Sequence, residues 1–259
     1  MNSINKTLYI PLYGKALVSK KGVILSDKTA ETIWESSNFS LKGKSKSKWL
    51  ACFMAMRAKV FDNWAYRLAL KYNDAVIIHL GSGLDSRVKR LNLNNLFYDV
   101  DFPAVISERK KYFSESENYK MIESDIKNVS FIDKLEKRDR AIVVIEGVSM
   151  YLPNDALKNT LQALANHYKN ISVLVDCYTP FAVKMSKIKN PINEVGATIV
   201  YGVGNPCDLQ TDNVKFTKEH QITPQTLIEE LKGFEKFVFR NLYAGKTAQK
   251  LYKLYEYES

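Results

Sequence analysis

The 259-residue chain has few of the side chains that build metal sites and disulfide frameworks. Its three cysteines, Cys52, Cys177 and Cys207, lie far apart, and its three histidines are equally scattered. This spacing excludes a disulfide-stapled scaffold and argues against structural zinc, so we expect no metal. No apolar run approaches the roughly 20 residues that span a bilayer. The first residues also lack the basic-then-apolar layout of a secretory signal. We therefore expect a cytoplasmic protein with no membrane partner.

The charge balance is strongly basic. The formal net charge is +10 and the sequence pI is near 9.3. Such a balance can steer nucleic acid or acidic small molecules toward a protein. Lysines, however, are spread from end to end, and the densest run, LKGKSKSKW at 41–49, also suits a solvated surface loop. The charge alone leaves open whether this run is a plain loop, a lid or a contact for an acidic partner.

Two different hydrophobic patterns divide the chain near residue 73. The first 73 residues are mostly helical in pattern, with helices expected over 28–38 and 47–72. From residue 75, short apolar runs alternate with segments long enough for helices, which indicates a parallel sheet with right-handed crossovers and helices on both faces. The runs expected as strands are 75–80, 95–100, 119–124, 141–146 and 171–176.

The C-terminal part is expected to complete this sheet. A clear helix is predicted over 154–168, where leucines recur every three or four residues. Later, 198–203 and 234–245 have strand-like patterns, and 223–234 between them is predicted to be a helix that ends at Gly233. A late strand pair of this kind commonly gives an α/β sheet an antiparallel edge.

Glycines and acidic residues follow the predicted strands. Ligands of open parallel sheets bind beyond the carboxyl ends of the strands, where the strand order reverses. The segments at these positions are Gly81-Ser82-Gly83, Asp99 to Asp101, Ser124 to Ile126, Glu146 to Pro153 and Asp176 to Pro180. The sequence therefore predicts one pocket with an acidic mouth beside a glycine loop.

The glycine loop matches half of a dinucleotide-binding fingerprint. The full G-x-G-x-x-G pattern would need glycine at position 86, which is Ser86, and this disfavours a nicotinamide-dependent oxidoreductase. Asp101 lies 20 residues after Gly81, where a carboxylate can accept hydrogen bonds from both hydroxyls of an adenosine ribose. Asp99 points to the same side of the strand and is the alternative. Either carboxylate could instead be a solvated strand end.

Four segments together resemble the leucine carboxyl methyltransferase family, and within it the bacterial O-methyltransferases of polyketide synthesis. They are HLGSGLDSRVKRL (79–91), YDVDFPAVISERKKYF (98–113), ESDI (123–126) and VIEGVSMYLP (144–153). The resemblance implies a Rossmann-like class I methyltransferase fold of the α/β class. Its mostly parallel seven-stranded sheet would have an antiparallel edge strand and an N-terminal helical extension. We expect residues 1–73 to form this extension, packed on a core of residues 74–259.

The resemblance also implies S-adenosylmethionine as the cofactor, with S-adenosylhomocysteine as the product, bound beside Gly81, Ser82 and Gly83. Asp101 would accept the ribose hydroxyls. Asp125 with Ile126 would offer an acceptor and an apolar wall to the adenine, although Asp125 also suits a helix N-cap. Glu146 ends an apolar strand, so its charge needs a partner there. That partner is the cofactor ammonium or a structural ion pair.

Arg57 is the candidate for the cofactor carboxylate. The predicted helix 47–72 has one apolar face, and Arg57 lies in the middle of that face. A guanidinium there must find an anion. The alternatives are bidentate capture of the cofactor carboxylate, which the resemblance implies, and a buried ion pair with a protein carboxylate. Arg87 is a second candidate, and is expected to support the glycine loop.

The residues that would act on the acceptor are less defined. Methyl transfer from a sulfonium is an in-line displacement, so the enzyme must align the reactants and exclude water. A carboxylate acceptor needs no general base, whereas a hydroxyl does. Tyr151, in SMYLP, is the catalytic candidate because it would lie near the pocket mouth and orient an acceptor, unless it only packs. Segment 178–197 has lysines among apolar residues, which suits a lid-like insertion or a surface helix.

We therefore expect an S-adenosylmethionine-dependent O-methyltransferase. Its acceptor would be a small molecule with a carboxylate or a hydroxyl group, and the protein would be a monomer or a homodimer. One alternative is a nucleic-acid methyltransferase, which the basic charge favours. Base-amino methylases, however, usually carry an N/D-P-P-Y/F loop where this chain has EGVSMYLP. The other alternative is a non-catalytic S-adenosylmethionine-binding protein.

Overall fold

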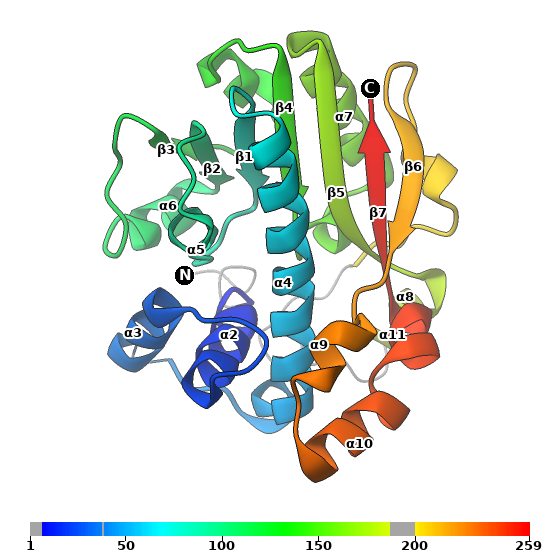
Figure 1. Cartoon of the computed structure of the whole chain (residues 1–259). Coiled ribbons are helices and arrows are strands. Elements are labelled where there is room, and N and C mark those ends of the chain that lie inside the picture. The colour runs from blue at the N-terminus through cyan, green and yellow to red at the C-terminus, as the bar shows by residue number, and fades with distance from the viewer. Residues whose placement is uncertain (1–6, 38, 187–199) are drawn as a thin grey trace.

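A mixed sheet forms the centre of the computed structural model, which describes residues 7–37, 39–186 and 200–259 (Figure 1). In this part of the chain the sheet has seven strands in the order β3-β2-β1-β4-β5-β7-β6. Strands β1 to β5 pair in parallel, and β7 runs antiparallel to both of its neighbours. The strands are β1 (Val76–Leu80), β2 (Phe97–Asp101), β3 (Tyr119–Glu123), β4 (Arg140–Ile145), β5 (Asn170–Tyr178), β6 (Lys215–His220) and β7 (Tyr252–Glu258).

Helices cover both faces of the sheet because its central strands are apolar on both sides. Side chains alternate along β1, so Ile77 packs in one cluster with Trp64 of α4 (Lys48–Lys71), whereas Ile78 packs in the other with Leu161 of α7 (Asn154–His167). The predicted parallel sheet and the predicted helix 154–168 are thus confirmed. The central strands bury a long apolar core that fixes where their carboxyl ends lie.

The N-terminal helices pack over these carboxyl ends. The helices predicted over 28–38 and 47–72 are confirmed as α3 (Lys28–Ser36) and α4. A further helix, α2 (Tyr9–Lys21), was not anticipated. It packs closely on α4 because Gly14 has no side chain: a Cβ there would lie 3.0 Å from the carbonyl oxygen of Ala51. The proposed division at residue 73 stays a prediction.

The predictions for the C-terminal strands are partly wrong. Residues 234–245 were expected to form a strand, but Gly233–Leu242 is the helix α10, and Gly233 begins it instead of ending the preceding helix. Val200 to Val203 of the other predicted strand are irregular, and its first two residues lie outside the described part. The antiparallel pair is built from β6 and β7 instead. Strand β6 is mostly exposed and charged, as suits an edge strand, so it has no apolar run to detect.

Short helices connect the remaining elements. Of the proposed lid-like segment 178–197, the first residues end β5 and form α8, whereas 187–197 lie outside the described residues. The helices are α5 (Arg87–Leu91), α6 (Pro103–Arg109), α8 (Pro180–Ser186), α9 (Gln225–Glu229), α10 and α11 (Gly245–Leu251), with 3-10 turns η1 (Gly43–Lys46), η2 (Val129–Lys134), η3 (Ser149–Tyr151) and η5 (Pro206–Leu209).

The strand order reverses between β1 and β4. From β1 the chain proceeds outward to β2 and β3, and then returns to β4 and β5 on the other side. Crevices at such a reversal bind ligands because the loops on its two sides diverge. The fold therefore directs attention to the loops after β1 and β4, which begin at Gly81 and Glu146.

Candidate active site

One cavity of about 630 Å³ lies at this reversal, beneath α2 and beside α4. Its volume falls within the range of about 300–1,000 Å³ that is typical of ligand sites. All the site residues predicted from the sequence line it. They are Arg57, Gly81, Ser82, Gly83, Asp101, Asp125, Ile126, Glu146 and Tyr151. Their roles toward a cofactor stay predictions, but their convergence on one cavity is a fact of the fold.

The glycine loop makes a tight turn that packs against Val148. Gly81 has φ +72°, and a Cβ there would lie 2.1 Å from Cγ2 of Val148. Gly83 also has a positive φ, +53°, and its backbone N–H donates to Oδ2 of Asp101 at 2.7 Å. Between them, the buried hydroxyl of Ser82 has no hydrogen-bond partner among the described residues. A buried polar atom of this kind fits a site that is completed by a bound molecule.

Asp101 ends β2 with its carboxylate directed into the cavity. Its two oxygens accept from the backbone N–H groups of Gly83 and Phe102, each at 2.7 Å. Burial raises the pKa of Asp101 to about 6, although these two hydrogen bonds oppose the shift. Asp99, the alternative, does not line the cavity. It is fully buried against Arg109 and Tyr119, so it has a structural role.

Asp125 and Ile126 follow β3 at the far side of the cavity. The Asp125 side chain is 36% exposed and lies 3.3 Å from the ammonium of Lys127, whereas Ile126 is buried in the core. The alternative interpretation of Asp125 as a helix N-cap is wrong. The next helical segment, η2, is capped by Asn128, whose side chain accepts from the N–H of Ser130.

Arg57 and Glu146 meet in the middle of the cavity wall. Arg57 comes from α4 and donates through Nε to Glu146 at 3.0 Å and through Nη1 to Asp176 at 2.8 Å. Arg87 contacts the second oxygen of Glu146. Burial alone would raise the pKa of Glu146, but Arg57 and Arg87 hold it below its ordinary value. The structural ion pairs expected as alternatives for Arg57 and Glu146 are therefore present, and Arg87 supports the loop as expected.

Lys15 is a cavity residue that the sequence analysis missed. It comes from α2, is 2% exposed, and contacts Asp85 in the loop after Gly83. Asp85 also lies 3.0 Å from Arg90, so it has a second cation. Burial alone would raise the pKa of Asp85, but Arg90 and Lys15 hold it well below its usual value. Lys15 follows Leu8 and Leu12 at helical spacing, which is the signal that identified Arg57.

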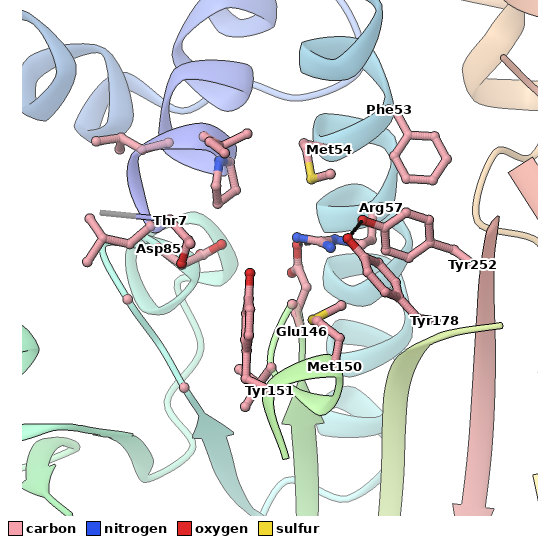
Figure 2. A pocket seen from close by; sticks show the side chains of 18 of the residues that line it. Thr7, Phe53, Met54, Arg57, Asp85, Glu146, Met150, Tyr151, Tyr178 and Tyr252 are labelled. Atoms are coloured by element: carbon pink, nitrogen blue, oxygen red, sulfur yellow. Dashed lines mark hydrogen bonds and ion pairs between the residues drawn. The ribbon is translucent and has the colours of Figure 1, made fainter. Parts of the chain in front are cut away.

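The other half of the cavity is apolar and aromatic. Figure 2 shows Phe53 and Met54 reaching it from α4, with Tyr178 and Tyr252 beyond Arg57. The hydroxyl of Tyr252 donates to that of Tyr178 at 3.1 Å. Tyr178 and Tyr252 also pack edge to face, with ring centroids 4.8 Å apart. This half offers an apolar ligand a wall with a few phenol hydroxyls.

Tyr151 stands where the two halves meet. It comes from η3 after β4, and in Figure 2 it rises between Asp85 and Glu146. Burial raises the pKa of Tyr151 well above that of an ordinary phenol, with the nearby Tyr178 adding to the shift. Tyr151 therefore keeps its proton at neutral pH and can act as a hydrogen-bond donor, but not as a base.

Two features are absent from the part of the chain that the structure describes. Within residues 7–37, 39–186 and 200–259, no three His, Cys, Asp or Glu side chains are grouped so that they could hold a metal ion. In the same residues, no helix is both long and apolar enough to cross a bilayer.

Replacement of Arg57 by methionine is predicted to destabilise the fold in a pH-dependent way. Asp176 would lose its cation while buried, and removal of one partner of a buried pair costs about 3–5 kcal/mol. Burial already raises the pKa of Asp176 even with Arg57 present. Protonation removes the unpaired charge, so the loss of unfolding free energy should be smaller at pH 5 than at pH 8. Urea denaturation at both pH values measures this difference.

Arg138 supplies a matched control, since it also pairs with two carboxylates, those of Asp74 and Glu136, but at the surface. Arg138→Met should leave the denaturation midpoint unchanged at both pH values. Equal losses for the two variants would contradict the structural role of the Arg57 pairs.

Known proteins share this sequence pattern and this fold. The family model described as leucine carboxyl methyltransferase matches residues 4–165. The tetracenomycin polyketide synthesis O-methyltransferase TcmP of Streptomyces glaucescens is 26% identical over 92% of this chain and 90% of its own length. An S-adenosyl-L-methionine-dependent methyltransferase of Gibberella zeae, dpfgK, is 25% identical over 82% of this chain and 79% of its own.

A solved structure supports the fold. Magnesium protoporphyrin IX methyltransferase of Synechocystis PCC 6803, solved with bound S-adenosylhomocysteine, superposes with a TM-score of 0.52 at 12% identity, over 89% of this chain and 92% of that one. The architecture is thus the Rossmann-like class I methyltransferase fold predicted from the sequence. Because the family model matches well over half of its residues, this chain belongs to the leucine carboxyl methyltransferase family and is an S-adenosylmethionine-dependent methyltransferase.

Proposed function

We propose that this enzyme methylates an oxygen atom of a small molecule with a largely apolar body, and that this oxygen belongs to a carboxylate. The observation that carries the proposal is the distribution of titratable groups in the cavity. Among the described lining residues, every carboxylate and histidine comes from β1 or β2 or from the segments after β1, β3 and β4. They are His79, Asp85, Asp101, Asp125 and Glu146.

The aromatic half of the cavity therefore offers no described carboxylate or histidine that could remove a proton from the acceptor. Burial raises the pKa values of its tyrosines Tyr151 and Tyr252, and Lys44 is a further titratable side chain of the lining. A hydroxyl acceptor would need a base, whereas a carboxylate is already ionised at neutral pH. A second observation supports methylation at oxygen: TcmP, which is similar over most of its length, is named as a polyketide synthesis O-methyltransferase.

The cofactor is proposed to lie along the strand ends. The carboxylate of Asp101 would accept the ribose hydroxyls, and Asp125 with Ile126 would hold the adenine. The positive φ angles of Gly81 and Gly83 allow the turn between them, and the unpartnered hydroxyl of Ser82 in this turn would gain a partner from the cofactor. This placement puts the amino-acid end beside the charged groups around Glu146.

Lys15 and Arg57 are proposed to bind the carboxylate of that amino-acid end together. Arg57 donates to Glu146 through Nε and to Asp176 through one N–H of Nη1, so its Nη2 group and the second N–H of Nη1 would be left for the cofactor. Lys15 can turn from Asp85 to the cofactor without leaving a buried charge alone, because Arg90 stays with Asp85. Glu146 would then attract the ammonium with its residual negative charge.

When bound, S-adenosylmethionine would supply a methyl group on a sulfonium. An oxygen nucleophile would attack the methyl carbon in line with the C–S bond, and the sulfur would leave. A lone pair of the acceptor carboxylate forms the new O–C bond while the C–S bond breaks toward sulfur, so an ester and S-adenosylhomocysteine result without proton transfer. The apolar wall of Phe53, Met54 and Met150 would exclude water from this reaction. Tyr151, which keeps its proton, would donate to the acceptor and orient it.

Calorimetry and mass spectrometry test the proposal in two stages. Titration with S-adenosylmethionine should show one site per chain. The protein with the cofactor should then add one methyl group to aromatic carboxylic acids, but not to the corresponding primary alcohols. Absence of cofactor binding would refute the placement of the cofactor. Transfer to the alcohols alone would refute the carboxylate as the acceptor.

Cofactor affinity is predicted to fall at acid pH because of Asp101. Its pKa is raised to about 6 in the free protein. The ribose hydroxyls need the ionised carboxylate, so protonation below this pH competes with binding. The dissociation constant of S-adenosylmethionine should rise by about fivefold between pH 6 and pH 5. Asp101→Asn should bind more weakly at pH 8 and lose this pH dependence. A flat profile for the unaltered protein would contradict the role of Asp101.

Replacement of Lys15 by methionine is predicted to weaken cofactor binding without unfolding the protein. The loss of a charge-assisted hydrogen bond should raise the dissociation constant of S-adenosylmethionine by about tenfold to a hundredfold. Lys20, five residues along α2 and 46% exposed, gives the control variant Lys20→Met, which should bind normally. Normal binding by Lys15→Met would leave Arg57 as the carboxylate site and refute the role of Lys15.

A further inference from the structure

Large apolar side chains gather on the surface near the mouth of the cavity. Eleven such side chains are exposed in the described part of the chain, and seven of them lie between residues 181 and 243. Three belong to α10, where Phe234 is 75%, Phe237 64% and Leu242 60% exposed. At 3.6 residues per turn these three fall within an arc of roughly 140°. Helix α10 therefore presents an apolar face to solvent.

Two further partly exposed residues also line the cavity. Met185 of α8 and Tyr243 at the end of α10 are 41% and 38% exposed, and both also line the cavity. The ring of Tyr243 stacks on that of Trp49, another lining residue, with centroids 5.3 Å apart. A molecule that enters the aromatic half here passes directly from the surface of α10 into the interior.

Basic side chains surround the same face. Segment 42–48 lies beside α10, since Lys48 contacts Glu235 at 3.1 Å, and Lys21 contacts the same carboxylate. In Figure 1, α10 and the beginning of α4 lie at one end of the molecule. The chain segments next to α10 carry the cations Lys21, Lys42, Lys44, Lys46, Lys48, Lys232, Lys236, Arg240, Lys246 and Lys250 and the carboxylates Glu229, Glu230 and Glu235. Glu235 pairs with Lys21 and Lys48, and Glu229 pairs with Lys236 and Arg240.

We propose that α10 and segment 42–48 form a docking face for an anionic lipid surface. Phenylalanine and leucine on one side of a helix flanked by lysine and arginine is the pattern of helices that lie in a membrane interface. The excess of cations over carboxylates matches anionic headgroups. Insertion of Phe234 and Phe237 would bring the rim residues Met185 and Tyr243 to the lipid.

A lipid surface fits this face better than a second protein does. Three protruding side chains present on the order of 400 Å², about half of what one partner contributes to a standard protein interface. Phe234, Phe237 and Leu242 also stand out from a surface helix, so these side chains can insert among lipid headgroups. The proposal departs from the expectation of no membrane partner, which came from the lack of a spanning segment and a signal sequence. A search for spanning segments and signal sequences does not detect an apolar face on the surface of a folded protein.

Docking would give an apolar acceptor a direct route from the bilayer to the cavity. This role in delivering the acceptor rests on the proposed function. The docking itself is independent of cofactor and acceptor. Its failure can therefore be told apart from failure of the proposed methyl transfer, because calorimetry with S-adenosylmethionine measures the latter in the absence of lipid.

Vesicle sedimentation tests the proposal. The full chain should sediment with phosphatidylcholine vesicles that contain phosphatidylglycerol, far less with pure phosphatidylcholine, and less again as salt is raised. The double variant Phe234→Ser/Phe237→Ser should bind at least about tenfold more weakly. Its affinity for S-adenosylmethionine should not change. The control is Leu70→Ser, which alters an equally exposed side chain (63%) at the opposite end of α4 and should bind vesicles normally.

Three results would overturn the proposal. The first is no sedimentation with any vesicle, and the second is equal sedimentation of the unaltered protein and the double variant. The third is a dimer of the unaltered protein in light scattering that the double variant converts to a monomer. That result would show that a second copy of the chain covers α10.

Discussion

Burial of several charges in one apolar interior is the constraint on which the site depends. Arg57 joins Glu146 to Asp176, and Arg87 holds the second oxygen of Glu146 while donating to Asp62 at 2.8 Å. Each charge left unpaired there would cost several kcal/mol. Helix α4, strands β4 and β5 and the loop after β1 must therefore keep their relative positions. Arg57 projects from the middle of the apolar face of α4. The helix that covers the sheet therefore also carries the central cation of the site.

This network divides the cavity into halves with different chemistry. Toward the strand ends, backbone N–H groups and the carboxylates of Asp101 and Asp125 suit a polar ligand with many hydrogen-bonding groups. Toward α8 and α11, Phe53, Met150 and Tyr252 suit an apolar one. The reacting atoms would meet at the boundary, where a charged wall lies beside a dry apolar one. A low local dielectric strengthens the pull of Glu146 on a cation there.

The sequence predicted the polar half well and the rest of the fold unevenly. The strands β1, β4 and β5 are apolar runs because both of their faces are buried, and the polar residues at or after their ends mark the site. Arg57 was found because a charge interrupts an apolar stripe, and Lys15 was missed although it interrupts one too. The C-terminal strands failed for a different reason. Edge strand β6 is polar, and the exposed Phe234 and Phe237 made the surface helix α10 resemble a buried strand.

The two halves of the cavity draw on different parts of the chain. The family model ends at residue 165, so it includes Arg57, Asp101, Glu146 and Tyr151. Much of the aromatic wall lies beyond it, on β5, α8, α11 and β7. A buried charge must have a partner of opposite sign at a fixed distance, so the polar half tolerates few changes. An apolar wall only needs to fill volume, and hydrophobic side chains of similar size can replace one another. The C-terminal third can therefore change the shape of the apolar half while the charged network of the polar half stays the same.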